Sequence, residues 1–336
     1  MRVWRLLLTC AAALAASGGA SAHHSPAAYD LTQEVVIEGT IAELAWRNPH
    51  IYLAIETTGM DGAPALQQVE ADAISTLQTA GVTREVLAPG ARVSIRAAPN
   101  RRGPGHTVLG FDVTLRDGAI YPLGPRGRVS SAPPQAPAAE SLAGKWAPSA
   151  SAFSALMQAI PSWPLTETAR AAREDVAGTL AAAAGCTPYP QPMLMGLHVL
   201  RTVEIEGDRV TIRLDWMGAE RTVRLDLTEH PPDLEPSLLG HSIGWWEGDT
   251  LVIDTIGFAP HRQGAGFGVP AGPDKHMVER LSLTEDRRGV RYEFTLEEPE
   301  ALHEPVTHVA VWEHRPDLEF SREDCDPEIA RRFLEE

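Results

Sequence analysis

The fold of the N-terminal part is decided by residues 35–44, Val-Val-Ile-Glu-Gly-Thr-Ile-Ala-Glu-Leu, in which apolar and polar side chains alternate. A period of two is typical of a β-strand that has one face on a core. Further strands are expected over 51–57, 68–72, 91–97 and 108–115, with a short helix over 74–80. Five strands with one helix before the fourth predict a small closed barrel of the OB-like class, which we place at residues 23–122.

A compositional break follows this barrel at residues 123–141, where prolines fall among serine, glycine and alanine without apolar periodicity. Such a stretch is typical of a linker between domains.

The remaining residues, 142–336, repeat short alternating stretches between tight turns such as Glu206-Gly207-Asp208. Helices are expected over 166–184 and 326–334, and Gly144-x-Trp146 is a pattern that lipocalins also carry at the start of their domain. At least seven antiparallel strands predict a lipocalin-like β-barrel or a strongly curved sheet. The expected strands are 199–205, 209–216, 221–227, 241–245, 250–255, 277–283, 290–296 and 307–314.

The first 22 residues have the order of a signal peptide: Arg2 and Arg5, an apolar run over 6–16, and the small residues Ala20-Ser21-Ala22. We therefore expect export to the periplasm and cleavage after Ala22. The apolar run is shorter than the roughly 20 residues that a membrane-spanning helix needs, and no later run is long enough, so no integral membrane segment is expected.

Removal of the two arginines in the signal peptide leaves 27 basic and 45 acidic residues, a net charge of −18. A strongly acidic protein is repelled by phosphate backbones and by anionic lipid surfaces. Nucleic acid is thus excluded as an expected partner.

Cleavage also removes Cys10 and leaves Cys186 and Cys325. An even pair of cysteines in an oxidising compartment predicts a disulfide between them. The alternative is two buried free thiols.

The most specific local feature is the mature N-terminus, where cleavage exposes the α-amine of His23, followed by His24. Amine and imidazole nitrogens suit copper, and one further imidazole would complete a three-nitrogen site. His50, which follows the Asn48-Pro49 turn, and His106 are the candidates for that ligand. The alternative is an exposed terminus that binds metal loosely, with His50 only capping the turn.

In the second domain, residues 240–244 match the Gly-x-Ser-x-Gly pattern of serine hydrolases around Ser242. A nucleophile elbow needs a strand that leads into a helix, whereas strands and a hairpin turn are predicted here. We therefore expect no catalytic residue at Ser242.

The motif around Ser242 is instead expected to be part of a structural core, with Trp245 or Trp246 filling the barrel. A polar residue on a strand faces inward only if it is paired, so Glu279 and Arg280, with Asp254, are expected to form a buried pair or to line a pocket. The candidate ligand-pocket residues are Trp46, Trp245, Trp246, Glu279 and Arg280.

Several motifs resemble known families. The residues His23-His24-Ser25, Glu38-Gly39-Thr40, Trp46-x-Asn48-Pro49-His50 and Leu87-x-Pro89-Gly90 resemble a secreted proteobacterial family known as a domain of unknown function, over about residues 23–121. Residues 240–255 and the Cys-Asp-Pro-Glu at 325–328 are similar to a second uncharacterised segment of such proteins. The resemblance implies export and two domains, and it implies no activity.

Taken together, the residues predict a periplasmic binding protein rather than an enzyme. They leave its ligand open, and copper at the mature N-terminus is the candidate. The alternatives are a carrier of an apolar small molecule in the C-terminal domain, a metal-dependent enzyme and an envelope-interaction protein. A small molecule or a metal ion is the expected partner, and the sequence leaves the oligomeric state open.

Overall fold

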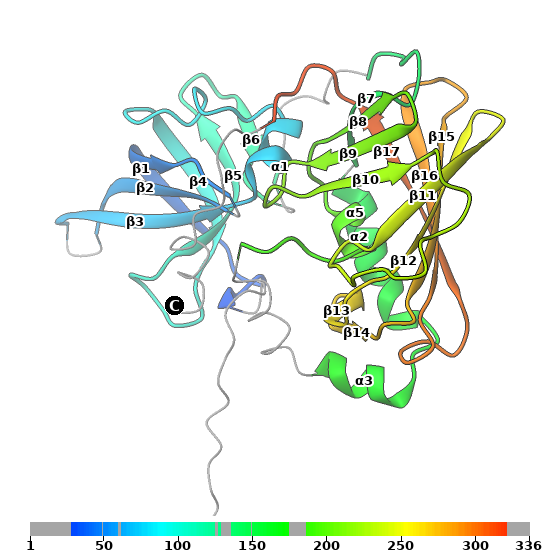
Figure 1. Cartoon of the computed structure of the whole chain (residues 1–336). Coiled ribbons are helices and arrows are strands. Elements are labelled where there is room, and N and C mark those ends of the chain that lie inside the picture. The colour runs from blue at the N-terminus through cyan, green and yellow to red at the C-terminus, as the bar shows by residue number, and fades with distance from the viewer. Residues whose placement is uncertain are drawn as a thin grey trace, which may run out of the picture.

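The computed structural model describes residues 28–48, 50–59, 62–124, 127–128, 136–148, 150–174 and 186–320. Its strands form two closed barrels (Figure 1), which confirms the mainly β fold class. The predicted signal peptide, the residues His23 and His24, the cysteine Cys325 and the predicted helix over 326–334 lie outside the described residues. None of the described helices is long and apolar enough to cross a membrane.

The first barrel has the strand order β3-β2-β1-β4-β5, closed by a parallel pairing of β3 with β5. Its elements are β1 (Val35–Ala45), β2 (Ile51–Thr58), β3 (Pro64–Ala71), α1 (Ile74–Thr79), β4 (Arg92–Ala98), β5 (Val108–Leu115) and β6 (Ile120–Pro122), which adds to β5. This is the strand order of an OB-fold, and α1 lies between β3 and β4 as the sequence predicts.

The alternation in the sequence explains the core of this barrel. Ile37 and Ile41 on β1 are buried, whereas Val36 is 59% exposed. At Gly39, β1 lies close to its neighbour β2, and a Cβ at this position would be 2.1 Å from the backbone oxygen of Glu56. A glycine is therefore required for the two strands to approach this closely.

The second barrel has nine strands in the order β10-β11-β12-β15-β16-β17-β7-β8-β9. These are β7 (Gly144–Pro148), β8 (Arg201–Glu206), β9 (Arg209–Leu214), β10 (Glu220–Arg224), β11 (His241–Glu247), β12 (Thr250–Ile256), β15 (His276–Leu283), β16 (Gly289–Glu297) and β17 (Val306–His314). The strands β13 (His261–Gly266) and β14 (Val269–Ala271) pair separately. The helices are α2 (Ala150–Ala159), α3 (Glu167–Glu174) and α5 (Met193–Gly196), with a 3-10 turn over Ile160–Ser162.

In an up-and-down barrel every pair of neighbouring strands runs antiparallel, and this barrel differs from that pattern at one pair. Among the described strands of the barrel, β10 and β11 run parallel and all other neighbours run antiparallel. Nine strands that alternate in direction cannot close without one parallel pair. Residues 225–240 make the long return connection that this pair requires.

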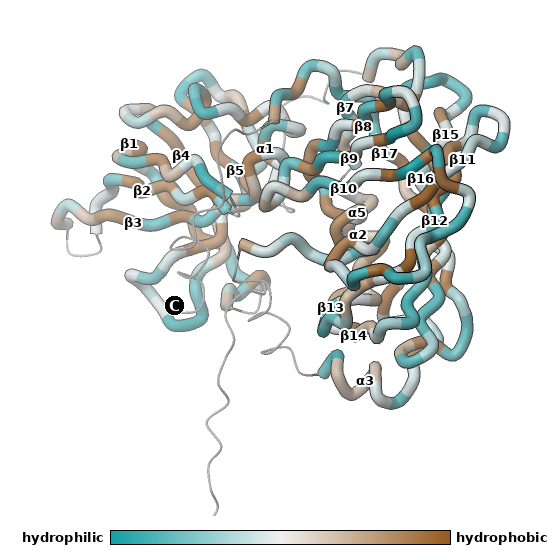
Figure 2. The backbone as a smooth tube through the Cα atoms, in the orientation of Figure 1, coloured by the Kyte–Doolittle hydropathy of each residue, from teal (hydrophilic) through white to brown (hydrophobic). Residues whose placement is uncertain are grey.

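The interior of the second barrel is filled by aromatic side chains and by α5. Trp146, Trp312 and Tyr292 are at most 1% exposed, and the side chains of Met193 and Met195 pack in the same core. The prediction that Trp245 or Trp246 fills the barrel is wrong, since each is 43% exposed. Both lie next to the turn that joins β11 to β12, at the end of the hairpin. Figure 2 shows that hydrophobic and hydrophilic residues both occur along the strands of each barrel.

A buried ion pair crosses this interior. Arg221 Nη1 donates to Glu279 Oε2 at 2.7 Å, and the hydroxyl of Tyr292 donates to Glu279 Oε1 at 2.8 Å. Arg221 Nη2 also donates to the hydroxyl of Ser242 at 2.9 Å. Burial of a charge is tolerated when the group is paired and hydrogen-bonded, so Glu279 faces inward as expected but pairs with Arg221. Arg280 faces outward and pairs with Glu247.

The described ends of the predicted linker pack on the barrels. Leu123 is buried in the core of the first barrel, and Leu142 is buried in that of the second. The backbone oxygen of Ala136 accepts a hydrogen bond from Arg288. The two barrels also touch, because Thr76 donates to the backbone oxygen of His198 and Arg315 donates to that of Thr79.

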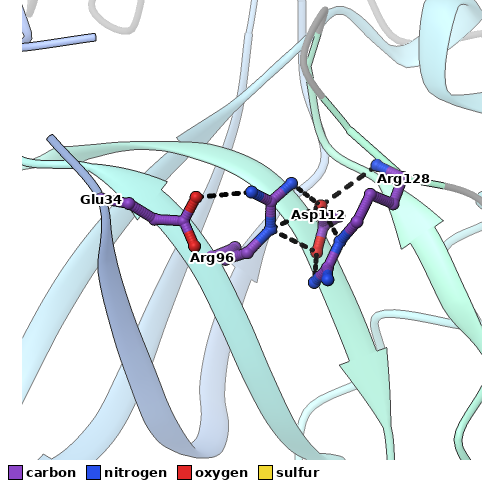
Figure 3. A network of polar contacts seen from close by, with 4 residues as sticks. All are labelled: Glu34, Arg96, Asp112 and Arg128. Carbon is purple, nitrogen blue, oxygen red and sulfur yellow. Dashed lines mark hydrogen bonds and ion pairs between the residues drawn. The ribbon is translucent and has the colours of Figure 1, made fainter. Parts of the chain in front are cut away.

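A second buried carboxylate ties the start of the linker to the first barrel (Figure 3). Asp112 on β5 accepts hydrogen bonds from Arg96 on β4, with Nη2 at 2.6 Å, and from Arg128, with Nη2 at 2.9 Å. Arg96 also pairs with Glu34 at 2.5 Å. Burial raises the pKa of Asp112, but the hydrogen bonds from Arg128 and Arg96 outweigh it and lower the pKa to about 2.

This lowered pKa predicts acid sensitivity. Because the ordinary value is 3.8, ionised Asp112 stabilises the fold above pH 4 by about 2 kcal/mol, and this contribution is lost as the pH falls towards 2. We expect Asp112→Asn to lower the free energy of unfolding by about that amount at pH 7 and by much less at pH 2.5, measured by urea unfolding. The matched control is Glu56→Gln, at an exposed carboxylate of the same barrel. A difference between wild type and Asp112→Asn that stays constant with pH would contradict this assignment.

Candidate functional site

His50 lies at the end of the turn that leads into β2. The side-chain oxygen of Asn48 accepts a hydrogen bond from the backbone N–H of Ile74 at 3.3 Å, which fixes this turn to the start of α1. The backbone N–H of Ile51 donates to the oxygen of Asp72. His50 is therefore held beside the last residues of β3.

A carboxylate stands behind the imidazole of His50. Nδ1 of His50 lies 3.2 Å from Oε1 of Glu70, whose side chain is 8% exposed. The other oxygen of Glu70 accepts a hydrogen bond of 2.5 Å from the hydroxyl of Tyr29. Tyr29 and Glu70 together restrict the orientation of the His50 ring, which keeps 30% exposure.

Asp72 is the second carboxylate of this site. Burial raises its pKa to about 6; His50 opposes the rise and Glu70 adds to it. Glu70 lies against the imidazole and Asp72 interacts with it electrostatically, so a cation that binds here would be stabilised by negative charge that is already in place.

The N-terminal segment enters the barrel at this site. Tyr29 forms a β-bridge with Asn100, and the backbone N–H of Arg101 donates to the oxygen of Ala28 at 2.9 Å. From this position the side chain of Tyr29 reaches Glu70, which contacts His50. Glu70 thus links Tyr29, near the start of the described residues, to the imidazole that the sequence proposes as a metal ligand.

His106 occupies a different position. It lies in the loop before β5, is exposed, and its backbone oxygen accepts a hydrogen bond from the side chain of Gln67. His50 lies opposite Asp72, which follows the end of β3. Asp72 is five residues after Gln67, a separation of roughly 16 Å at about 3.3 Å per residue. His50 and His106 therefore do not meet, although the N-terminal segment contacts the loop that contains His106 through Arg101.

Within the described residues, no group of three or more histidine, cysteine, aspartate or glutamate side chains is arranged to hold a metal ion. His23 and His24 lie outside those residues. The predicted disulfide stays a prediction for the same reason, since Cys186 is described and Cys325 is not.

The candidate pocket residues do not line one pocket. Trp46 is buried in the core of the first barrel, and Glu279 is buried inside the second. Trp245 is exposed, and its indole N–H donates to Glu247, the residue that pairs with Arg280 on the outer face. Alternate residues on one strand point to opposite faces of the barrel wall, so neighbours such as Glu279 and Arg280 separate.

Sequence reasoning missed a polar cluster on the outer face of the second barrel. His230 and His276 each place Nε2 against Asp254, at 2.8 and 2.7 Å, and Nδ1 of His230 lies 2.8 Å from Nδ1 of His241. His241 and Asp254 fall in the 240–255 motif, and the β11–β12 hairpin alone would bring them near each other. His230 and His276 come from outside this hairpin, and no local pattern predicts them.

The comparisons with known proteins add one finding. Residues 12–109 match the model of a family described as "Family of unknown function (DUF6152)". This confirms the resemblance of the N-terminal part to a domain of unknown function. No curated protein matches the chain.

The raised pKa of Asp72 gives a test of the site. Its charged form costs stability above the ordinary pKa of 3.8, so the fold becomes less stable as the pH rises through that value towards about 6. We expect Asp72→Asn to raise the free energy of unfolding at pH 7.5 by roughly 1–2 kcal/mol, allowing for the partial exposure of the side chain, and to change it little at pH 4. Thermal unfolding at the two pH values, with Glu43→Gln as an exposed control, measures this. A destabilised variant at pH 7.5 would show that the charge of Asp72 is favourable.

Proposed function

We propose that the protein is a periplasmic metal-binding protein that holds copper between its mature N-terminus and His50. The observation that carries the proposal is the chain of contacts from Tyr29 through Glu70 to Nδ1 of His50. This chain brings the N-terminal segment and the imidazole to one place.

The contact of His50 with Glu70 supports this proposal. Histidine ligands commonly place one ring nitrogen against a carboxylate. This contact fixes the ring and makes the other nitrogen a better electron-pair donor to a metal ion. Glu70 stands at Nδ1, so Nε2 is the nitrogen that would bind the metal. Tyr29 in turn fixes Glu70.

The N-terminal ligands are within reach. Cleavage after Ala22 would place His23 six residues before Tyr29, and six extended residues span at most about 20 Å. The amine and ring of His23 with Nε2 of His50 would give three nitrogen donors, which favour copper among the available ions. Glu70 and Asp72 would add negative charge close to that cation.

The carrier alternative gains no comparable support. The described interior of the second barrel contains Trp146, Trp312 and Tyr292 together with the Arg221–Glu279 pair. An apolar ligand in that space would have to displace packed aromatic rings or a buried ion pair.

The test uses protein purified from periplasm without an N-terminal tag, whose intact mass first establishes where the mature chain begins. Calorimetric titration with Cu(II) is expected to show one tight site. We expect His23→Ala and His50→Ala to abolish it. Glu70→Gln should weaken it by about 10- to 100-fold, because the His50 ring loses its carboxylate.

His303→Ala, at an exposed histidine of the second barrel, is the matched control and should bind like wild type. His106→Ala tests the other candidate ligand. A mature chain that begins elsewhere than His23, or copper binding that is indifferent to His50, would reject the proposal.

A further inference from the structure

The connection between β10 and β11, residues 225–240, lies along the outer face of the second barrel and is called the strap here. Its ends are fixed by backbone hydrogen bonds, from Leu225 to Asp208 and from Ser237 to Gly257. Between these points the side chain of His230 is 12% exposed and points onto the barrel wall. His230 therefore anchors the middle of the strap.

Two partners hold His230, and both come from the barrel. Its Nε2 lies 2.8 Å from Oδ1 of Asp254 on β12, and its Nδ1 lies 2.8 Å from Nδ1 of His241 on β11. An ionised carboxylate only accepts hydrogen bonds, so Nε2 of His230 carries a proton and donates to Asp254. The contact between the two Nδ1 atoms then has room for a single proton.

This proton count limits the charge that the pair can carry. When both rings are neutral, His241 donates from Nδ1 to His230, and when one ring is charged the hydrogen bond is kept. When both are charged, two N–H donors face each other at a distance that suits one hydrogen bond, and two positive charges repel. The doubly charged pair cannot keep this contact.

We propose that the His230–His241 contact is a pH-sensitive latch, which holds the strap on the barrel while at most one of the two imidazoles is charged and releases it when both are. The latch lies in the second barrel and is independent of the proposed metal site.

The surrounding charges decide the order of protonation. Burial, His230 and Arg224 on β10, which itself pairs with Asp226, lower the pKa of His241. On the other side of Asp254, the hydrogen bond to Asp254 raises the pKa of His276 on β15 against the effect of burial. Glu297 on β16 lies 3.6 Å from Nδ1 of His276 and acts in the same direction. His276 is therefore charged before His241.

The sign of the pH effect follows from proton binding. The released strap binds up to one proton more than the closed strap, because both imidazoles can be charged once they are apart. Lowering the pH until both are charged in the released state favours release by up to about tenfold per pH unit.

Hydrogen–deuterium exchange of the full mature chain in EDTA tests the latch. Exchange in peptides from 226–240 is compared at pH 7.5 and pH 5.0, after correction for intrinsic rates, with peptides of the β15–β16 hairpin as the internal reference. We expect strap opening in the wild type to increase about tenfold or more at pH 5.0.

His241→Asn keeps a polar atom near the position of Nδ1 but cannot be charged, so its strap should not open further when the pH falls to 5.0. His276 contacts Asp254 but neither of the two Nδ1 atoms of His230 and His241. His276→Gln is therefore the matched control and should keep the wild-type pH dependence. A wild-type strap with equal opening at both pH values overturns the proposal, whether or not the variants fold. A strap in His241→Asn that still opens in acid also overturns it.

Discussion

A closed barrel with an odd number of strands must contain a parallel pair of neighbours, because strict alternation of direction cannot return to its start. Here the first barrel closes through β3 and β5, and the second contains the parallel pair β10 and β11. A parallel pair needs a long connection, which in the second barrel is the strap of residues 225–240. Both polar sites lie beside these pairs: Glu70 is in the β3–β5 register and His241 begins β11.

Paired charges let the barrel walls carry ionisable groups on either face. Inside the second barrel, Glu279 is held by Arg221 and Tyr292, and in the first barrel Asp112 is held by Arg96 and Arg128. Removing one partner of the fully buried Arg221–Glu279 pair would leave a buried charge, at a cost of roughly 3–5 kcal/mol. The same rule applies at Glu70, which is buried with a tyrosine and a histidine as its partners. Each of these buried carboxylates is therefore stabilised by partners at the position where its strand places it.

The strands could be predicted because their evidence is local. The alternation over 35–44 and over 199–227 marks both the strands and their buried faces, and the helix of the first barrel was found where it was expected. The exposure of Trp245 and Trp246 could not be predicted, since alternation assigns a face to each residue and does not tell where the barrel wall ends. The sequence does not show which residues face each other across the barrel. Arg221, the partner of Glu279 and 58 residues away from it, was therefore missed. His50 was proposed from its turn, whereas Tyr29 and Glu70 were not, because their contact joins a bridge at residue 29 to a strand 41 residues later.

We propose that His50 and the mature N-terminus bind one copper ion together. Electron paramagnetic resonance of the mature protein loaded with one equivalent of Cu(II) tests it most directly, because hyperfine coupling counts the nitrogen ligands. We expect coupling to nitrogens that include the His50 imidazole, with one imidazole lost in His50→Ala while the N-terminal nitrogens remain. A spectrum that His50→Ala leaves unchanged would contradict it.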